Sequence, residues 1–212
     1  MINSPNNPSG KYYDSKILKQ LSEVLLDNDS IFISSDDIYE HIHWSDEKFH
    51  NILNIAPSLK DRTVILNGVS KAYSMTGWRI GYAAGNRDII KKMKTLQSQS
   101  TSCASSISQA AACMALSQKC SEMPLMNKEY KKRHDYVVNE LNKINGVFCK
   151  ETDGTFYVFP SFEKYIQKSN TINNDAELAL YLLNTAKVSI SVAKQFILYR
   201  MYRILISFMR VI

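Results

Sequence analysis

The sequence predicts an α/β fold, because short apolar runs alternate with amphipathic helical patterns along its 212 residues. Two apolar runs, at 31–34 and 63–70, lead into polar residues, as buried parallel strands do. A third run, at 79–85, ends in glycine. With 45% hydrophobic and 22% charged residues, the chain has a globular composition and can bury a substantial core.

The first residues predict a tight loop followed by a helix. Residues 1–10 hold two prolines, a glycine and three asparagines. Asp14 is the expected N-cap of an amphipathic helix, whose apolar positions are Ile17, Leu18, Leu21, Val24 and Leu25. Further along, Asp36 and Lys71 follow predicted strands, and the carboxyl ends of strands are where α/β sheets carry functional side chains.

Helical patterns dominate from residue 86 to 144. An apolar stripe marks the first helix, and its members are Ile89, Ile90, Met93 and Leu96. An alanine-rich helix at 103–118 and a charged helix at 125–144 follow. We place the domain boundary inside this region, which gives a first domain of residues 1–124 and a second of residues 125–212.

The second domain begins with the charged helix, after which the residue pattern changes from helical to alternating. Residues 147–160 alternate in a way that is typical of a hairpin. Asn174 and Glu177 have the spacing of a capping box in front of an apolar helix. The sequence therefore predicts a small α+β domain after the helical region.

The charge and cysteine patterns favour a soluble cytoplasmic protein. The formal net charge is +6, but the basic residues are dispersed, which favours solvated helix faces over a nucleic-acid or membrane surface. A basic nucleic-acid-binding module is a weaker hypothesis that predicts salt-sensitive DNA binding. The four cysteines form no C-x-x-C pair, and no apolar run reaches the roughly 20 residues of a membrane span. The N-terminus has no signal-peptide pattern.

Five residues together match the needs of one cofactor, pyridoxal 5′-phosphate (PLP). A lysine in a confined site can lose its proton and react with an aldehyde. PLP also needs an acid at its ring nitrogen, donors to its ring hydroxyl, and an arginine at its phosphate. Asn7, Asp36, Tyr39, Lys71 and Arg79 supply candidates for all these contacts.

Four stretches of the sequence carry a resemblance to a known family. They are "NSPNNPSG", "SDDIYEHI", "SKAYSMTGWRIGY" and "DGTFYVFP". In this order they resemble the signature stretches of the class I aminotransferases, with the aspartate aminotransferase branch the most similar, and the resemblance covers residues 1 to about 190. It implies the PLP-dependent transferase fold type I, with residues 1–124 as a partial large domain with a mostly parallel sheet. Residues 125–212 would then be an interdomain helix and a small C-terminal domain.

The resemblance also implies roles for the five residues. Lys71 matches the lysine that binds PLP covalently and moves the substrate proton, and Asp36 matches the aspartate at the ring nitrogen. Tyr39 and Asn7 match the residues that hydrogen-bond the ring hydroxyl. Arg79 matches the arginine at the phosphate.

Three further residues are weaker candidates. Ser70 precedes the lysine and is a candidate phosphate contact, although the family often places its phosphate-binding serine at the position of Gly68. Phe156 could line the substrate cleft or belong to a structural strand. Arg203, in "YRILISF", is an imperfect match for the arginine that binds the substrate carboxylate, because its spacing to Ser207 is too long.

The histidine pair at positions 41 and 43 suggests a metal site as one alternative. The two rings would point to one face of an extended segment, but no third ligand is nearby in the sequence. A surface or core pair is therefore favoured, and no metal is expected.

Two departures from the family pattern carry their own hypotheses. The chain begins at the Asn-Pro motif, so we expect it to be a C-terminal portion that lacks the N-terminal half. Residues 190–212 are atypical for the family, which we interpret as the result of a frameshift. Such a portion would expose sheet edges and apolar faces, so we expect either poor solubility or dependence on a partner chain.

The function implied by the resemblance is amino-group transfer from an amino acid to a 2-oxo acid. Aspartate and 2-oxoglutarate are the favoured pair, and a homodimer is the usual assembly of the family. Alternatives are another fold type I activity such as a C–S lyase, a non-catalytic degenerate fragment, or one half of a split enzyme.

Overall fold

A computed structural model describes residues 1–118, 120–192 and 204–207, with the side chains of 204–207 left aside. The chain divides into two compact units. Unit 1 comprises Met1–Pro5 and Tyr12–Asn127, and unit 2 comprises Asn6–Lys11 and Lys128–Ile212. The turn Asn6–Lys11 is therefore part of unit 2, although unit 1 flanks it in the sequence.

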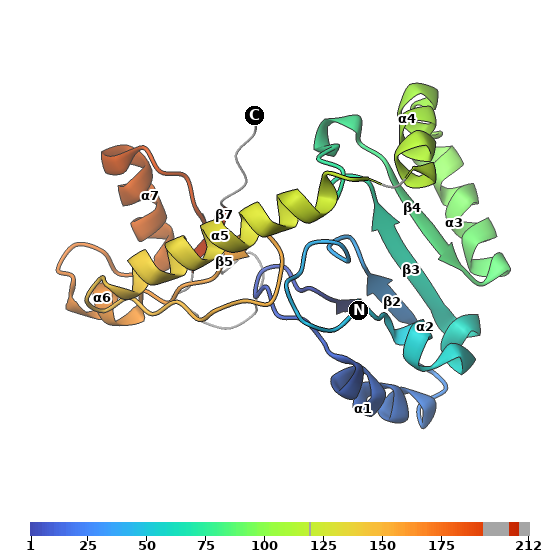
Figure 1. The fold of residues 1–212 in the computed structure, drawn as a ribbon, viewed down its shortest axis with the longest axis horizontal. Coiled ribbons are helices and arrows are strands. Elements are labelled where there is room, and N and C mark those ends of the chain that lie inside the picture. The colour runs from blue at the N-terminus through green and yellow to red at the C-terminus, as the bar shows by residue number, and fades with distance from the viewer. Residues whose placement is uncertain (119, 193–203, 208–212) are drawn as a thin grey trace. The chain divides into compact units, whose positions relative to one another are not determined.

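Unit 1 is built on a four-stranded sheet with the order β1-β2-β3-β4 (Figure 1). Its strands are β1 (Ile2–Asn3), β2 (Ile33–Asp36), β3 (Thr63–Gly68) and β4 (Gly81–Gly85). The first three are parallel and β4 runs antiparallel to β3. The predicted α/β class is confirmed; Asp36 is the last residue of β2, and Lys71 lies three residues after the end of β3.

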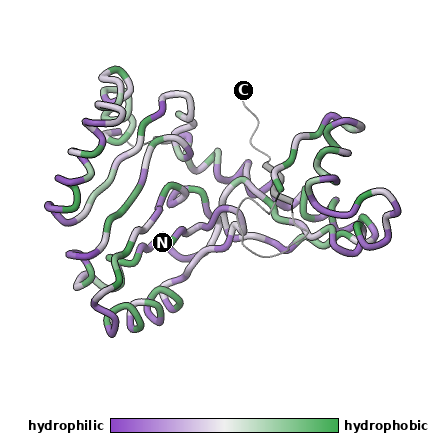
Figure 2. The backbone as a smooth tube through the Cα atoms, turned by 180° about the vertical axis from the view of Figure 1, so that it is seen from behind, coloured by the Kyte–Doolittle hydropathy of each residue, from purple (hydrophilic) through white to green (hydrophobic). Residues whose placement is uncertain are grey.

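The helices of unit 1 begin with α1 (Ser15–Leu26), where the predicted N-cap holds. The Asp14 carboxylate accepts a hydrogen bond from the Ile17 backbone N–H at 2.7 Å. Apolar and polar residues alternate along this helix (Figure 2). The others are α2 (Ile52–Ile55), the 3₁₀ helices η1 (Pro57–Arg62) and η2 (Thr76–Trp78), α3 (Arg87–Ser100) and α4 (Ser106–Ser117).

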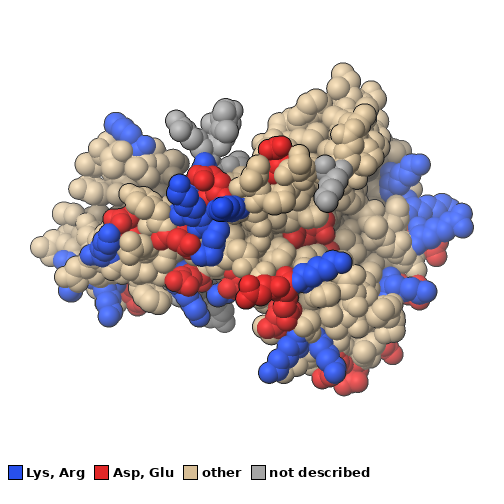
Figure 3. Space-filling view, in the orientation of Figure 1, with Lys and Arg blue, Asp and Glu red and all other residues tan. Residues whose placement is uncertain are grey.

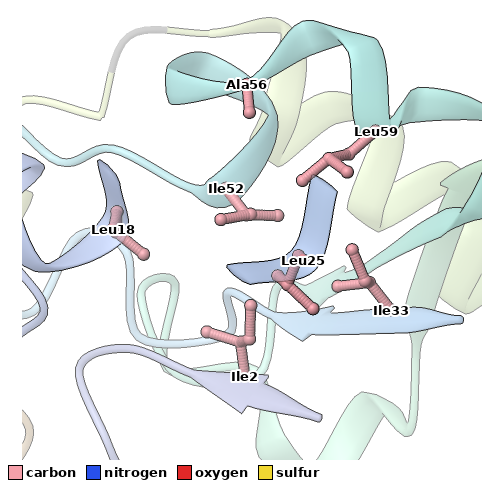
Figure 4. Close-up of a cluster of buried hydrophobic side chains, with 7 residues drawn as sticks. All are labelled: Ile2, Leu18, Leu25, Ile33, Ile52, Ala56 and Leu59. Carbon is pink, nitrogen blue, oxygen red and sulfur yellow. The ribbon is translucent and has the colours of Figure 1, made fainter. Parts of the chain in front are cut away.

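The core of unit 1 joins α1 and α2 to the sheet. Its buried side chains point toward one another from both helices, η1 and the first two strands, and they are Ile2, Leu18, Leu25, Ile33, Ile52, Ala56 and Leu59 (Figure 4). Burial of this apolar area holds both helices against β1 and the start of β2.

Unit 2 contains most of the long helix α5 (Met123–Asn142) and a small antiparallel sheet. The sheet has the order β5-β7-β6, and the elements are β5 (Tyr157–Val158), α6 (Glu163–Lys168), α7 (Asp175–Ala186), β6 (Ser191–Val192) and β7 (Ile204–Ser207). The Asn174 side chain accepts from the Glu177 N–H at 3.0 Å, so the predicted cap is confirmed. The predicted hairpin is reduced to one bridge, Phe148 to Ser161, because β5 pairs with β7 instead.

Of the apolar stripe predicted on α3, Ile89 and Ile90 are half-buried, whereas Met93 and Leu96 are exposed. Helix α3 has no buried residue, and Leu96 is 72% exposed. The next helix, α4, exposes Ile107 at 71% and also Met114. Lys and Arg gather over α3, whereas the rest of the face in Figure 3 mixes both signs of charge. In the described part of the chain, no helix is both long and apolar enough to cross a membrane.

Arg62 binds carbonyl groups at and just after the C-terminal end of α1, and its loss is expected to destabilise unit 1. Its guanidinium donates to the carbonyl oxygens of Leu25, Asn28 and Ile31. Arg62→Ala should lower the free energy of unfolding by about 1–2 kcal/mol, because one partly buried carbonyl, that of Leu25, and two exposed carbonyls lose a charged donor. Urea unfolding checks this, with Lys60→Ala as the matched control on η1. Equal stability of the two variants would contradict it.

Candidate active site

Asp36 and Asp37 follow one another at the end of β2 but have different surroundings. The Asp37 carboxylate is buried and accepts hydrogen bonds from Ser35 Oγ at 2.7 Å and Asn51 Nδ2 at 2.9 Å. It therefore ties β2 to the start of α2. The Asp36 carboxylate accepts from the Ile38 backbone N–H at 3.3 Å, and partial burial raises its pKa.

Lys71 and Tyr39 lie together beyond the ends of β3 and β2. The Lys71 Nζ atom is 5.9 Å from the centre of the buried Tyr39 ring. Burial lowers the pKa of Lys71, and the positive charge of Arg79 lowers it further. A lysine with a depressed pKa is a better nucleophile at neutral pH than an ordinary one.

The segment that carries Lys71 and Arg79 contains two residues in the left-handed region. Ser74 has φ 55° and Arg79 has φ 51°, a conformation that costs about 1–3 kcal/mol for residues other than glycine. Arg79 Nη1 donates to the Thr76 carbonyl oxygen at 2.7 Å, which holds the guanidinium beside its own turn. Such strain gathers at functional sites, and here both residues lie in the segment that the sequence singles out.

A hydrogen bond that the sequence analysis missed joins the Tyr39 turn to the end of β3. Asn67 Nδ2 donates to Glu40 Oε1 at 2.6 Å, and Asn67 Oδ1 accepts from the Gly68 N–H at 2.7 Å. The pair links the segments that carry Tyr39 and Lys71. The two residues are 27 positions apart, so no local pattern indicates the contact.

Ser70 and Gly68 lie on the approach to Lys71. The Ser70 carbonyl oxygen accepts from the Met75 N–H at 3.1 Å and so helps to close the turn after the lysine. Gly68 lies against β4: a Cβ there would lie 3.1 Å from the Ile80 carbonyl oxygen and 3.2 Å from the Gly81 Cα. This crowding disfavours a serine at position 68.

Asn7 and Phe156 belong to unit 2. Asn7 lies in the Asn6–Lys11 turn, where the Gly10 N–H donates to the Asn6 carbonyl oxygen at 2.7 Å. Phe156 is buried between aromatic rings, 5.6 Å from Tyr130 and 4.6 Å from Tyr157, measured between ring centres. This burial favours the structural alternative for Phe156, and a role in the substrate cleft stays a prediction.

The remaining candidates are Arg203 and the histidine pair. Arg203 lies outside the described residues, directly before β7. His41 Nε2 is 3.5 Å from Glu40 Oε1, whereas the His43 ring stacks on Tyr12 at 5.2 Å between ring centres. The two rings therefore have different neighbours.

Arg79→Ala is expected to raise the pKa of Lys71, because it removes one of the two causes that lower it. At a fixed pH below that pKa, a smaller fraction of the amine is then neutral and reactive. Competitive acetylation against pH measures this, and the midpoint for Lys71 should move to higher pH. Arg87→Ala, at the start of α3, is the control that should leave the midpoint unchanged. An unchanged midpoint in Arg79→Ala would contradict the coupling.

Comparison with protein families identifies one that spans nearly the whole chain. The family described as aminotransferase class I and II matches residues 1–209. The match includes the segment after residue 190 that differs from the expected pattern.

Individual relatives agree with this family. The chain is 42% identical over 208 residues to the aspartate aminotransferase of Rhizobium meliloti strain 1021, covering 96% of this chain and 51% of the relative. It is 45% identical over 194 residues to the aspartate/prephenate aminotransferase of Nitrosomonas europaea, covering 89% and 49%. The chain thus spans about half the length of the curated relatives it matches.

Solved structures give the same result. The crystal structure of the aspartate aminotransferase from Rhizobium meliloti superposes with a TM-score of 0.88 at 41% identity, covering 98% of this chain and 52% of that one. The aspartate aminotransferase from Thermotoga maritima superposes with a TM-score of 0.82 at 32% identity, covering 98% and 50%.

Proposed function

Because the chain belongs to the class I and II aminotransferases, we propose that its Lys71 region is a PLP site for amino-group transfer. The observation that carries the proposal is Lys71 itself, an amine at the end of β3 whose pKa is lowered by burial and by Arg79. Class I and II aminotransferases use PLP, whose aldehyde and electron-withdrawing ring supply the chemistry.

The residues of unit 1 fit this cofactor by their chemistry. Lys71 offers an amine for the aldehyde, and Arg79 offers a guanidinium for the phosphate. Asp36 offers a carboxyl whose pKa is raised by burial, so a positively charged ring nitrogen would stabilise its ionised form. Tyr39 offers a phenol beside Lys71. The role of Asn7 as a second donor to the ring hydroxyl is proposed from its motif.

Each of these residues has one task in the proposed reaction. Lys71 would hold the cofactor through its neutral Nζ, and this amine, once the substrate amino group has displaced it, would take the proton from the substrate Cα and return it. Arg79 and Ser70 would hold the phosphate, and Asp36 would keep the ring nitrogen protonated. Glu40 and Asn67 hold the two turns together while Lys71 moves.

The proposed substrates are an amino acid, with aspartate favoured, and a 2-oxo acid, with 2-oxoglutarate favoured. The support is the names of the relatives, which are aspartate or aspartate/prephenate aminotransferases. A carboxylate-binding role for Arg203 and assembly as a homodimer are proposed from the family resemblance.

A single-turnover assay tests the proposed function. The full chain is loaded with PLP and mixed with L-aspartate, and the 2-oxo acid released is counted per chain. About one equivalent is expected, and 2-oxoglutarate should then regenerate the starting cofactor form. The same assay is run with the part of the Rhizobium meliloti relative that this chain does not match added in trans. Release in neither sample would contradict the proposal.

A second candidate is that the chain is one half of a two-chain enzyme. The observation that favours it is the apolar surface of α3 and α4, where Leu96, Ile107 and Met114 are exposed. Surfaces of this kind normally contact another protein segment. Under this candidate, the added part of the relative is required for turnover, so release of the 2-oxo acid by this chain alone would contradict it.

A further inference from the structure

His134 is a buried histidine of α5 in unit 2 with a defined tautomer. Its side chain is fully buried, and its Nε2 atom accepts a hydrogen bond from the Thr152 backbone N–H at 3.0 Å. Because Nε2 accepts, the proton of the neutral ring is on Nδ1, which lies 2.9 Å from Asp135 Oδ1. The histidine therefore joins the helix to the loop at 152–155.

The same loop holds the turn that carries Asn7. The backbone N–H groups of Asp153 and Gly154 both donate to the Gly10 carbonyl oxygen, at 2.9 and 3.0 Å. Lys11 Nζ adds an ion pair with Asp153 Oδ1 at 3.1 Å. Three contacts thus attach the Asn6–Lys11 turn to the loop.

The turn is closed by its own hydrogen bonds, so its anchoring sets the position of Asn7. Gly10 N–H donates to the Asn6 carbonyl oxygen, and the Asn6 N–H donates to the Lys11 carbonyl oxygen at 2.9 Å. Asn6 Oδ1 also accepts from the Ser9 N–H at 3.1 Å and from Ser9 Oγ at 2.7 Å. A shift at Gly10 is therefore transmitted to the whole turn.

We propose that His134 is a positioning residue for Asn7 and acts only while its Nε2 is unprotonated. The neutral His134 ring accepts a hydrogen bond from the Thr152 N–H and so positions the loop at 152–154. The N–H groups of that loop donate to the Gly10 carbonyl oxygen and so position the Asn6–Lys11 turn. The consequence for cofactor binding rests on the proposed function, since it assumes that Asn7 contacts PLP.

The charges around His134 set the pH at which this contact is lost. Burial lowers the pKa of His134, Asp135 and Glu151 oppose that shift, and Lys131 adds to it. Asp135 is itself paired with Lys131 at 2.5 Å. Protonation would put an imidazolium N–H against the Thr152 N–H, so two donors would face each other.

The effect on stability has a definite sign. The folded-state pKa of His134 is lowered, so the unfolded chain takes up the proton first as the pH falls. The contribution of His134 is complete above the unfolded-state pKa of about 6.5 and is lost as the pH falls through that value toward the folded-state pKa.

Hydrogen exchange of the full chain without cofactor tests the first part of the proposal. The intrinsic pH dependence of exchange is divided out with an unstructured peptide of the same sequence. Protection of the amides at 152–154 should fall steadily as the pH falls from about 6.5 toward the folded-state pKa of His134. His134→Gln offers an acceptor that does not titrate, so it should keep the protection and abolish the pH dependence. His134→Leu should lose the protection at every pH, and His50→Gln should behave as the wild type.

PLP affinity of the same variants tests the second part. At pH 7.5 the Leu variant should bind PLP at least about fivefold more weakly than the wild type, and the Gln variant should match the wild type. Protection that is independent of pH in the wild type would overturn the role of His134, even if the Leu variant fails to fold. Altered protection with equal affinity in all three proteins would overturn the link to Asn7. If the wild type does not bind PLP, both the proposed function and the link between His134 and Asn7 in cofactor binding are wrong. The hydrogen-exchange result tests the contact between His134 and Thr152 independently of PLP.

Discussion

Lys71→Ala is expected to remove the visible absorption band that the chain develops with PLP, and to reduce amino transfer at least about 100-fold. A positioned group that moves a proton in the rate-determining step contributes roughly 10²–10⁴-fold, and the covalent attachment is lost as well. The lowered pKa of Lys71 is the physical reason why this lysine should react in preference to others. Titration with PLP, followed by absorption spectra, measures the effect.

Two control variants test whether the effect of Lys71→Ala comes from loss of a reactive amine. One keeps the positive charge at position 71, and the other removes a different lysine. Lys71→Arg keeps a positive charge, but a guanidinium does not lose its proton, so the band should still be absent. Lys92→Ala removes an exposed lysine of α3 and should leave the band unchanged. A band of wild-type intensity in Lys71→Ala would show that another amine reacts.

Gly10→Ala is expected to be the most destabilising single change in the Asn7 turn. Gly10 has φ +66°, and a Cβ there would lie 2.5 Å from Thr152 Cβ and 2.7 Å from its Cγ2. The left-handed conformation costs about 1–2 kcal/mol and overpacking another 1–3 kcal/mol, so unfolding should become easier by about 2–5 kcal/mol. Urea unfolding of the chain, followed by the signals of the tyrosines of unit 2, measures the loss; both tryptophans, Trp44 and Trp78, lie in unit 1.

Gly77→Ala is the matched control for this prediction. A Cβ at Gly77 has no atom within 4 Å, and its φ lies outside the left-handed region. The free energy of unfolding should change by less than about 1 kcal/mol. If the two alanine variants were equally stable, the contact between Gly10 and Thr152 would not exist as described.

Local signals explain which parts of the fold could be predicted. The start of α1 follows from Asp14, and the start of α7 follows from Asn174, because both caps involve residues only three positions apart. The strand β3 follows from a short apolar run with a polar end, whereas β2 begins two residues later than the run at 31–34 and leaves Ile31 and Phe32 exposed. The placement of Lys71 after β3 follows from the same pattern, whereas Asp36, expected after its strand, is the last residue of β2.

The parts that could not be predicted depend on contacts between distant residues. The periodicity of α3 shows that one face is apolar, but it does not show what packs on that face, and Leu96 is exposed. The hydrogen bond between Glu40 and Asn67 spans 27 positions, and the one between His134 and Thr152 spans 18. No periodic or motif signal relates such pairs in a single sequence.

Neighbouring residues of similar chemistry also receive different roles from the fold. Asp36 and Asp37 are both acidic, but the Asp37 carboxylate accepts hydrogen bonds from the side chains of Ser35 and Asn51. The family resemblance assigns the contact with the ring nitrogen to Asp36. The hydrogen bonds of Asp37 give a physical reason why Asp37 has a structural role.

The most direct test of the central claim is to locate the residue that PLP modifies. The full chain is incubated with PLP, reduced with borohydride, digested, and mapped by mass spectrometry. The account predicts that the reduced adduct is on the peptide that contains Lys71, at close to one per chain. Adducts spread over surface lysines, with Lys71 unmodified, would contradict it.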